Sequence, residues 1–225
     1  MVPTQRRERW LDWLNTLRDD LYNVFLWRAT WLTVGDMVRA NPDIQPSHYF
    51  AYLANTYGTS QAVAVRRLAD DRSDVVSLAR LIKEVRKHAT EITVEWWVGL
   101  DPNIDARDFG RFRASGADHF DPSIASDDLA GLRGAVADVK AYVDEHLADR
   151  DPSPTKDIPT FATIHAALDS VSAIFATYYT NLTGASILVF VPEPQIGWYR
   201  PFIVPWLAPG SKPVRLRGTL RGDPL

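Results

Sequence analysis

Apolar side chains recur at steps of three and four residues through most of residues 1–184, which is the spacing expected of helices. The first such segment begins at Pro3-Thr4 and ends before Asn41-Pro42, where the proline stops a helix. Its apolar face is formed by Trp10, Leu14, Leu17, Leu21, Val24, Phe25, Trp31 and Leu32. Trp13, Trp27 and Trp31 widen that face, so we expect a broad core-facing surface rather than a ligand site.

Two or three helices are expected in the next part of the chain. Ser47 is the predicted N-cap of a helix that ends near Asp70-Asp71. Ser73-Asp74 is the predicted cap of the following helix. The pattern of residues 91–100 is ambiguous, and we favour a helix that packs its tryptophan pair.

Residues 99–124 contain glycine, proline and many charges, which predicts a long surface connection. Another helix is predicted to start at Asp127 or Asp128 and to end before residues 151–154, which read Asp-Pro-Ser-Pro. The last helix is predicted to open at Pro159-Thr160 and to stop at Gly184.

The composition changes after Gly184, because seven of the 15 prolines lie between Pro192 and Pro224. The end of this stretch is basic, and a solvated tail is favoured there over an RNA-contacting arm. We therefore predict an all-α protein with two parts. Residues 1–184 form an up-and-down bundle of about five helices, and residues 185–225 form an extended, proline-rich, basic arm.

The net charge and the cysteine content limit the kinds of partner and site that this chain can have. A net charge of −3 disfavours a broad nucleic-acid surface, and DNA is not an expected partner. The absence of cysteine excludes disulfides, zinc thiolates and cysteine nucleophiles. No signal-peptide pattern is present, and the longest apolar run, residues 187–191, is too short to span a bilayer. We expect a cytoplasmic protein with no membrane partner.

Candidate chemistry is sparse. The five histidines form no H-x-x-x-H or H-E-x-x-H pair, and no P-loop, G-x-S-x-G or G-x-G-x-x-G motif occurs. We therefore expect no cofactor and no metal. His146 and Asp149 stand three residues apart on one helical face, where they could bind a metal or orient the imidazole. An ordinary exposed helix end explains the same pair.

The order of several short segments resembles the HEPN superfamily, in particular its abortive-infection U type. The matching segments are residues 27–55, Arg-Leu-Ala-Asp at 67–70, Ser-Leu-Ala-Arg-Leu at 77–81, KAYVDEHLADRDP at 140–152, PTFATIHAALD at 159–169 and YYTNLTG at 178–184. The resemblance covers about residues 10–184. It implies an up-and-down helical bundle, commonly dimeric, that takes part in phage defence or toxin–antitoxin systems.

Active members of that superfamily cleave RNA without metal through an R-x(4–6)-H motif. The histidine exchanges protons with the ribose and the leaving oxygen, and the arginine stabilises the phosphorane. Here the alignment puts Asp149 at the histidine position and Val143 at the arginine position. The literal match, Arg113 to His119, falls in the glycine-bearing connection, and about one such match is expected by chance.

Three hypotheses follow. The first is a HEPN-like defence protein that acts by protein or RNA binding without ribonuclease activity, as a homodimer that buries the helix end carrying His146. The second is a metal-independent ribonuclease with a rearranged catalytic site at His146, Asp149 and Arg150, in which His146 is the acid/base and Arg150 the electrophile. The third is a helical scaffold for protein contacts, unrelated to nucleic acid.

Overall fold

The computed structural model describes residues 4–41, 47–101, 104–148, 157–185, Gly197 and 200–203. It divides the chain into two compact units, Met1–Pro192 and Glu193–Leu225. In the second unit one short helix is described, α7 (Arg200–Ile203). The first unit holds the long helices α1 (Thr4–Ala40), α2 (His48–Leu68), α3 (Leu78–Lys87), α5 (Pro122–Tyr142) and α6 (Phe161–Thr183).

Shorter helical segments complete this unit: η1 (Ala89–Glu91), α4 (Val94–Val98), η2 (Ala106–Phe112) and the π-helix η3 (Val143–Ala148), which extends α5. Over these residues there is no strand, only an isolated antiparallel bridge between Thr93 and His119. The predicted all-α class is confirmed.

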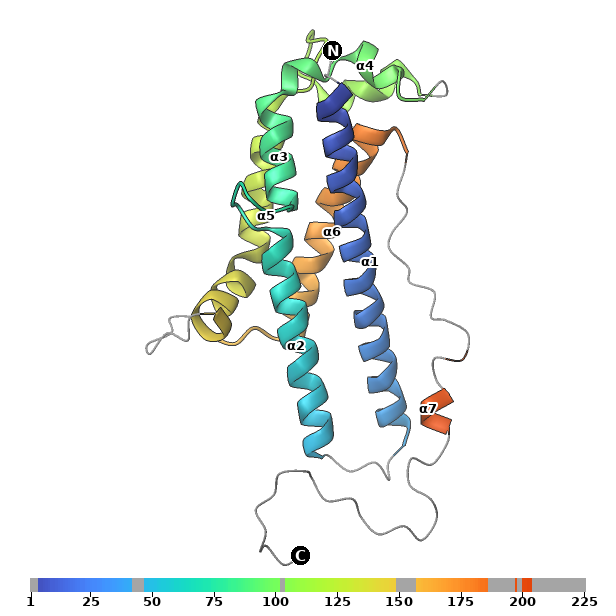
Figure 1. Cartoon of the computed structure of the whole chain (residues 1–225), viewed down its shortest axis with the longest axis vertical. Helices are drawn as coiled ribbons and strands as arrows, with labels where there is room; N and C mark the ends of the chain where they lie inside the picture. The colour runs from blue at the N-terminus through green and yellow to red at the C-terminus, as the bar shows by residue number, and fades with distance from the viewer. Residues whose placement is uncertain are drawn as a thin grey trace, which may run out of the picture. The chain divides into compact units, whose positions relative to one another are not determined.

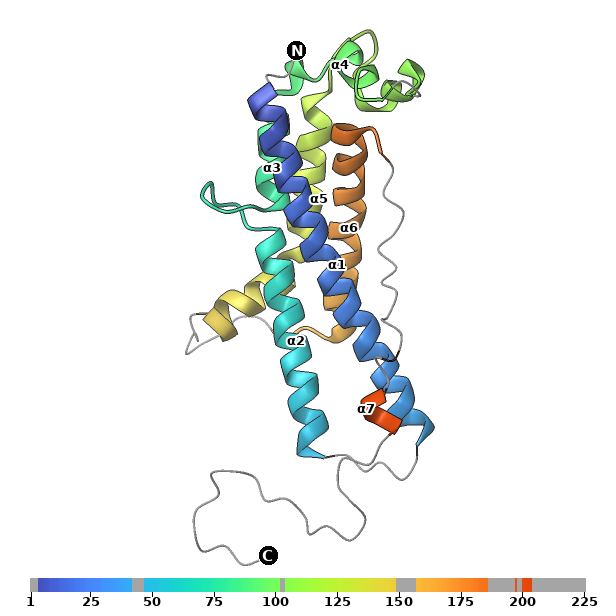
Figure 2. The ribbon, with the colours of Figure 1, turned by 45° about the vertical axis from the view of Figure 1, so that its right-hand side comes forward.

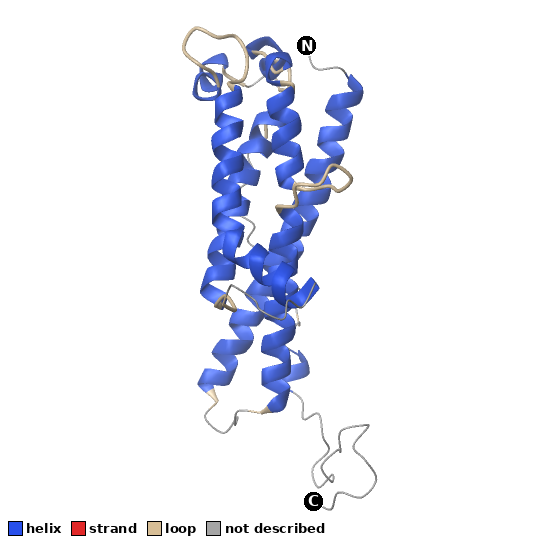
Figure 3. Ribbon diagram, turned by 90° about the vertical axis from the view of Figure 1, so that its left-hand side faces the viewer, coloured by secondary structure: helices blue, strands red, loops and turns tan. Residues whose placement is uncertain are grey.

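The five long helices form an up-and-down arrangement (Figure 1). α1 runs in one direction and α2 returns beside it, and α3 continues roughly along the line of α2 after a loop (Figures 1 and 2). α5 then runs back and α6 returns. Because α2 and α3 share one position, the cross-section holds four helices, which we call the four-helix section. Figure 3 shows the same bundle from the side, with helices as its regular elements.

The core runs the length of the four-helix section, and each long helix contributes one apolar face. Fully buried side chains from the five helices include Leu17, Leu21, Val65, Leu81, Ile82, Leu132, Leu168, Val171 and Phe175. Arg80 of α3 places its guanidinium 4.2 Å from the centre of the Trp13 ring, so a charged residue closes one edge of the core.

The helix ends confirm most of the predicted signals. Ser47 precedes α2, Thr160 caps α6 by accepting a hydrogen bond from the Thr163 amide, and Gly184 ends α6 at φ 75°. The prediction for α3 is wrong, because its N-cap is Ser77 rather than Ser73-Asp74. The Ser77 hydroxyl is fully buried, donates to the Asp70 carbonyl and accepts from the Arg80 amide, so it ties the loop to the helix.

The predicted surface connection at residues 99–124 is also wrong. Its aromatic side chains Phe109, Phe112 and Phe120 are buried, and Trp97 of α4 lies 5.5 Å from Phe109 between ring centres. The segment is thus an aromatic cap over one end of the bundle. α5 starts at Pro122 with Asp121 as its cap, five residues before the predicted Asp127, because the proline fits the first helical turn.

The prediction that the apolar face of the first helix is buried in the core is confirmed for only part of that helix. Trp13 is buried, but Trp27 and Leu32 are 48% and 46% exposed. No residue between 25 and 40 of α1, or between 48 and 56 of α2, is fully buried. We call these two stretches the α1–α2 projection, because they continue past the four-helix section (Figure 1).

Among the described helices, none combines the length and apolar character needed to cross a bilayer. Nearly all of the predicted arm at residues 185–225 lies outside the described residues, so the proposed boundary at Gly184 stays a prediction.

Candidate functional site

The π-helix η3 carries the one predicted catalytic residue that the structure describes. α5 passes into η3 without a break, since Val143 keeps helical torsion angles of φ −64° and ψ −45°. π-helical turns are rare and are frequently found at functional sites. His146 is half-buried in η3, with its ring 5.3 Å from that of Tyr142 one turn earlier. Asp149 and Arg150 lie outside the described residues, so the predicted trio stays a prediction.

Val143, which the resemblance aligns with the motif's arginine, is buried in the core and is 3% exposed. An arginine there would place a charge in the apolar core, which is strongly unfavourable. The local fold therefore suits the valine of this sequence and has no place for the motif's arginine.

Arg66 of α2 contacts this turn and is held by two carboxylates. Its Nε donates to Asp144 at 2.8 Å and its Nη1 to Asp70 at 3.0 Å. Lys140 also donates to Asp144, at 2.6 Å. Burial alone would raise the pKa of Asp144, but the hydrogen bonds from Lys140 and Arg66 outweigh it and lower that pKa. This network fixes η3 against α2.

The literal Arg113-to-His119 match is part of an exposed loop. Arg113 Nη1 donates to the Ala117 carbonyl within the same loop, and His119 Nδ1 lies 3.0 Å from its neighbour Asp118. Both groups stabilise the turn they belong to. The geometry does not join them into a catalytic pair.

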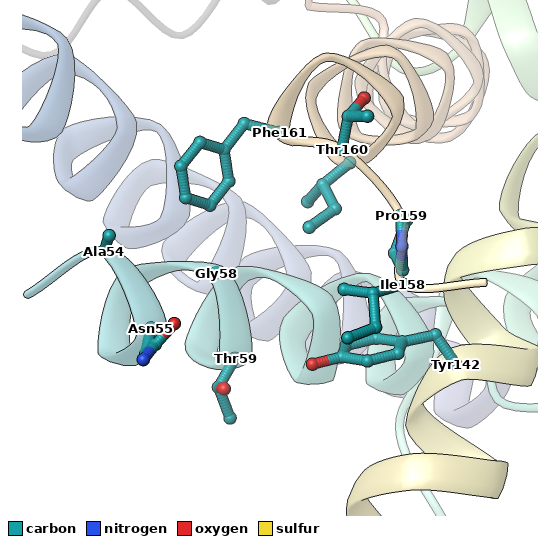
Figure 4. Close-up of a pocket in the computed structure, with 10 residues that line it drawn as sticks. Ala54, Asn55, Gly58, Thr59, Tyr142, Ile158, Pro159, Thr160 and Phe161 are labelled. Carbon is teal, nitrogen blue, oxygen red and sulfur yellow. The ribbon is translucent and has the colours of Figure 1, made fainter. Parts of the chain in front are cut away.

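A pocket of about 490 Å³ opens between α2, the end of α5 and the start of α6 (Figure 4). It is lined by Ala54, Asn55, Gly58, Thr59, Tyr142, Ile158, Pro159, Thr160, Phe161 and Ile164. Phe161 and Tyr142 stand on opposite sides, and the Tyr142 hydroxyl is directed toward Thr59 (Figure 4). None of the lining residues is Asp, Glu, Lys, Arg or His.

Gly58 shapes this pocket. A Cβ at this position would lie 2.9 Å from Phe161 Cε1, so the glycine lets the phenylalanine ring rest directly on the α2 backbone. An isolated glycine inside a helical pattern is the sequence signal that could have drawn attention to this place. Tyr142 and Phe161 carried no such signal, because helix-spaced aromatic residues normally mark a core.

Beside Phe161, the buried Tyr57 of α2 pairs with the partly buried His165 of α6. The Tyr57 hydroxyl is 2.6 Å from His165 Nε2, and the Tyr57 ring stacks on Trp31 with centres 4.9 Å apart. Burial raises the pKa of Tyr57 to about 12, against a lowering by Arg28. Burial and then the Arg28 charge lower the pKa of His165, so the ring is neutral at pH 7 and shares one hydrogen bond with the protonated Tyr57 hydroxyl.

No group of three or more His, Cys, Asp or Glu side chains suited to a metal ion occurs among the residues whose positions are described.

Comparison of the chain with protein-family models, curated proteins and solved structures finds no match. The HEPN resemblance therefore rests on the residues quoted above and stays a prediction.

Proposed function

We propose that this chain is a HEPN-like helical protein that acts by binding, without cleaving RNA, and that the α1–α2 projection binds a second copy of the chain. The observation that carries the proposal is the burial pattern of the projection. Its large apolar side chains Trp27, Leu32, Tyr49 and Tyr52 are 48%, 46%, 49% and 64% exposed.

Two packed helices bury only the strip along which they touch, and the projection consists of two helices. α5 ends at Tyr142, and α6 begins at Phe161, whose ring contacts Trp31 and Tyr57. Among the described helices of the first unit, no other long helix extends beyond that level (Figure 1). A second projection, related by a two-fold axis, supplies the two missing helices and rebuilds a four-helix cross-section.

The charges of the projection favour a copy of itself over RNA. Residues 25–40 contain three charged side chains and residues 48–56 contain no Asp, Glu, Lys or Arg. Arg28 is paired with Asp169 at 2.6 Å, and Arg39 is paired with Asp36. Without a surplus of cations the surface offers little to phosphates, and two copies meet without like-charge repulsion.

Loss of ribonuclease chemistry is supported by the surroundings of η3. The arginine position of the motif is the buried Val143, and the neighbouring Arg66 is already bound by Asp70 and Asp144. Membership of a phage-defence or toxin–antitoxin system and a cytoplasmic location are parts of the same proposal, carried by the resemblance alone.

Self-association is tested by sedimentation velocity over a concentration series. The natural protein is expected to form dimers, and a Leu32→Glu/Tyr52→Glu variant is expected to stay monomeric. Val63→Glu is the matched control, because Val63 is 43% exposed on α2 beside the four-helix section. A natural protein that is monomeric throughout, or a control that dissociates as fully as the variant, would contradict the proposed surface.

Catalysis is tested separately by incubating the protein with a folded tRNA and total RNA in the presence of EDTA. We expect no cleavage. Cleavage that His146→Ala abolishes would overturn the non-catalytic assignment and support the rearranged site.

A further inference from the structure

We infer that the pocket between α2, Tyr142 and the start of α6 binds an uncharged, planar aromatic ligand of the nucleobase or nucleoside type. The inference is independent of self-association and of the HEPN resemblance. The volume of the pocket, about 490 Å³, falls within the range of ~300–1,000 Å³ typical of small-molecule sites.

The walls of the pocket suit a flat ring. Phe161 and Tyr142 come from different helices and stand on opposite sides of the opening (Figure 4). Aromatic side chains of this kind bind bases by stacking, and the preference is general because every base has a π-face. Ile158, Pro159 and Ile164 add apolar surface at the α6 side, which favours a ligand that leaves water.

Phe161 is held in place as a wall. Its ring lies on Gly58, edge-on to Trp31 and Tyr57 at 5.5 Å from each ring centre. Tyr57 is in turn fixed by its hydrogen bond to His165. The stacking surface is therefore formed before a ligand arrives, which reduces the ordering entropy lost on binding.

The polar groups of the pocket are those that recognise the edge of a base. Asn55 offers an amide donor and acceptor together, and Thr59 and Tyr142 each offer a hydroxyl. In the described part of the chain these three side chains make no hydrogen bond to the protein, so they are available to a ligand. An amide paired with hydroxyls can bind the alternating donors and acceptors of a heterocycle.

Charge excludes an anionic ligand. None of the lining residues carries a cationic side chain. A phosphate on the ligand would find no arginine or lysine in the lining to pair with. The neutral nucleoside is thus favoured over its monophosphate.

The test titrates adenosine, guanosine, cytidine and uridine, and their 5′-monophosphates, into the isotope-labelled full chain, followed by two-dimensional NMR. We expect at least one nucleoside to shift the amide signals of Gly58 and Thr59. Tyr142→Leu removes one ring and should weaken binding about fivefold or more, the low end of losing one base–aromatic stack. Asn55→Ala, at an exposed position, should weaken binding as well.

Tyr22→Leu is the matched control, because Tyr22 is an exposed α1 tyrosine outside both the pocket and the projection, and it should leave the affinity unchanged. Three results would each overturn the inference. They are the absence of shifts with every nucleoside, an affinity of both pocket variants equal to that of the natural protein, and tighter binding of a monophosphate than of its nucleoside. Sedimentation velocity on the same samples reports self-association, so failure of one assignment is distinguished from failure of the other.

Discussion

Residues 4–24 and residues 25–40 of α1 have a similar spacing of apolar side chains but different surroundings. Trp10, Leu14, Leu17, Leu21 and Val24 are buried, whereas no residue of the second stretch is. The difference comes from the neighbours: the first stretch packs in the four-helix section, and the second belongs to the α1–α2 projection. An amphipathic pattern therefore specifies a helix and its apolar side, and leaves open what covers that side.

The largest expected contrast between the two regions comes from removing an aromatic side chain in each. Phe175→Ala empties a fully buried site and should lower the free energy of unfolding by about 3–5 kcal/mol. Trp27→Ala should change it by less than about 0.5 kcal/mol, because Trp27 is half exposed. Urea denaturation of dilute protein, followed by circular dichroism, measures both.

An equal loss for the two variants would show that the projection is packed within one chain. A loss for Trp27→Ala that grows with protein concentration would instead report the proposed self-association.

A pair of tyrosine variants sharpens the comparison for hydrogen bonding. Tyr178 is 1% exposed, and its hydroxyl donates to Asp128 at 3.0 Å. Tyr178→Phe leaves this partly buried carboxylate without its donor and should lower the free energy of unfolding by about 1–3 kcal/mol. Tyr52→Phe, on the projection, should stay within about 0.5 kcal/mol. Thermal denaturation compares them, and equal stability of both variants would argue against the Tyr178–Asp128 bond.

A glycine pair examines the boundary between the regions. Gly131 is exposed on α5, and a Cβ there would meet nothing within 4 Å. Gly131→Ala should therefore stabilise the protein by about 0.5–1 kcal/mol. Gly58→Ala should have the same gain in helix propensity, but most of the resulting stabilisation should be offset because the new Cβ displaces Phe161. Urea denaturation should therefore rank Gly131→Ala above Gly58→Ala, with a changed near-ultraviolet spectrum only for the latter. Equal stabilisation would mean that Phe161 does not rest on the helix.

The smallest effect is a pH dependence at the same boundary. His165 faces Tyr57 of α2, Arg28 of α1 and Asp169 of its own helix, and its pKa is lowered on folding, chiefly by burial. Below the ordinary histidine value of about 6.5, the unfolded chain binds more protons than the folded chain. Stability from this group is therefore present above that pH and is lost as the pH falls toward the folded pKa.

The measurement is the difference in unfolding free energy between the natural protein and His165→Gln as the pH is lowered from 7.5. The pH is kept above the pKa values of the carboxylates, so that those groups do not titrate. We expect the difference to shrink as the pH falls. A constant difference would show that His165 has the same proton affinity in both states.

Several local features could be predicted from the sequence because they depend on neighbouring residues only. Thr160 and Gly184 bound α6 as expected, since a hydroxyl cap and a residue at positive φ are determined within one turn. The start of α3 could not be predicted in this way. Ser73 and Ser77 are both suitable caps, and the choice of Ser77 depends on its contact with the Asp70 carbonyl across the loop.

The candidate sites show the same division. His146 could be singled out from its spacing to Asp149, but the burial of Val143 and the binding of Arg66 by two carboxylates depend on α2 packing against η3. The pocket was not predicted at all. Its residues come from segments far apart in the chain, around Asn55, Tyr142 and Phe161, and no spacing rule relates them.

The sequence by itself determined the helical class, the principal helices and several of their ends, because periodicity and capping act over a few residues. The tertiary structure decided which apolar faces are covered. It buries Phe109, Phe112 and Phe120 in a segment rich in charge and glycine, and it leaves Trp27 and Tyr52 exposed on regular helices. Burial depends on which distant segments lie alongside, and that is a property of the whole packed chain.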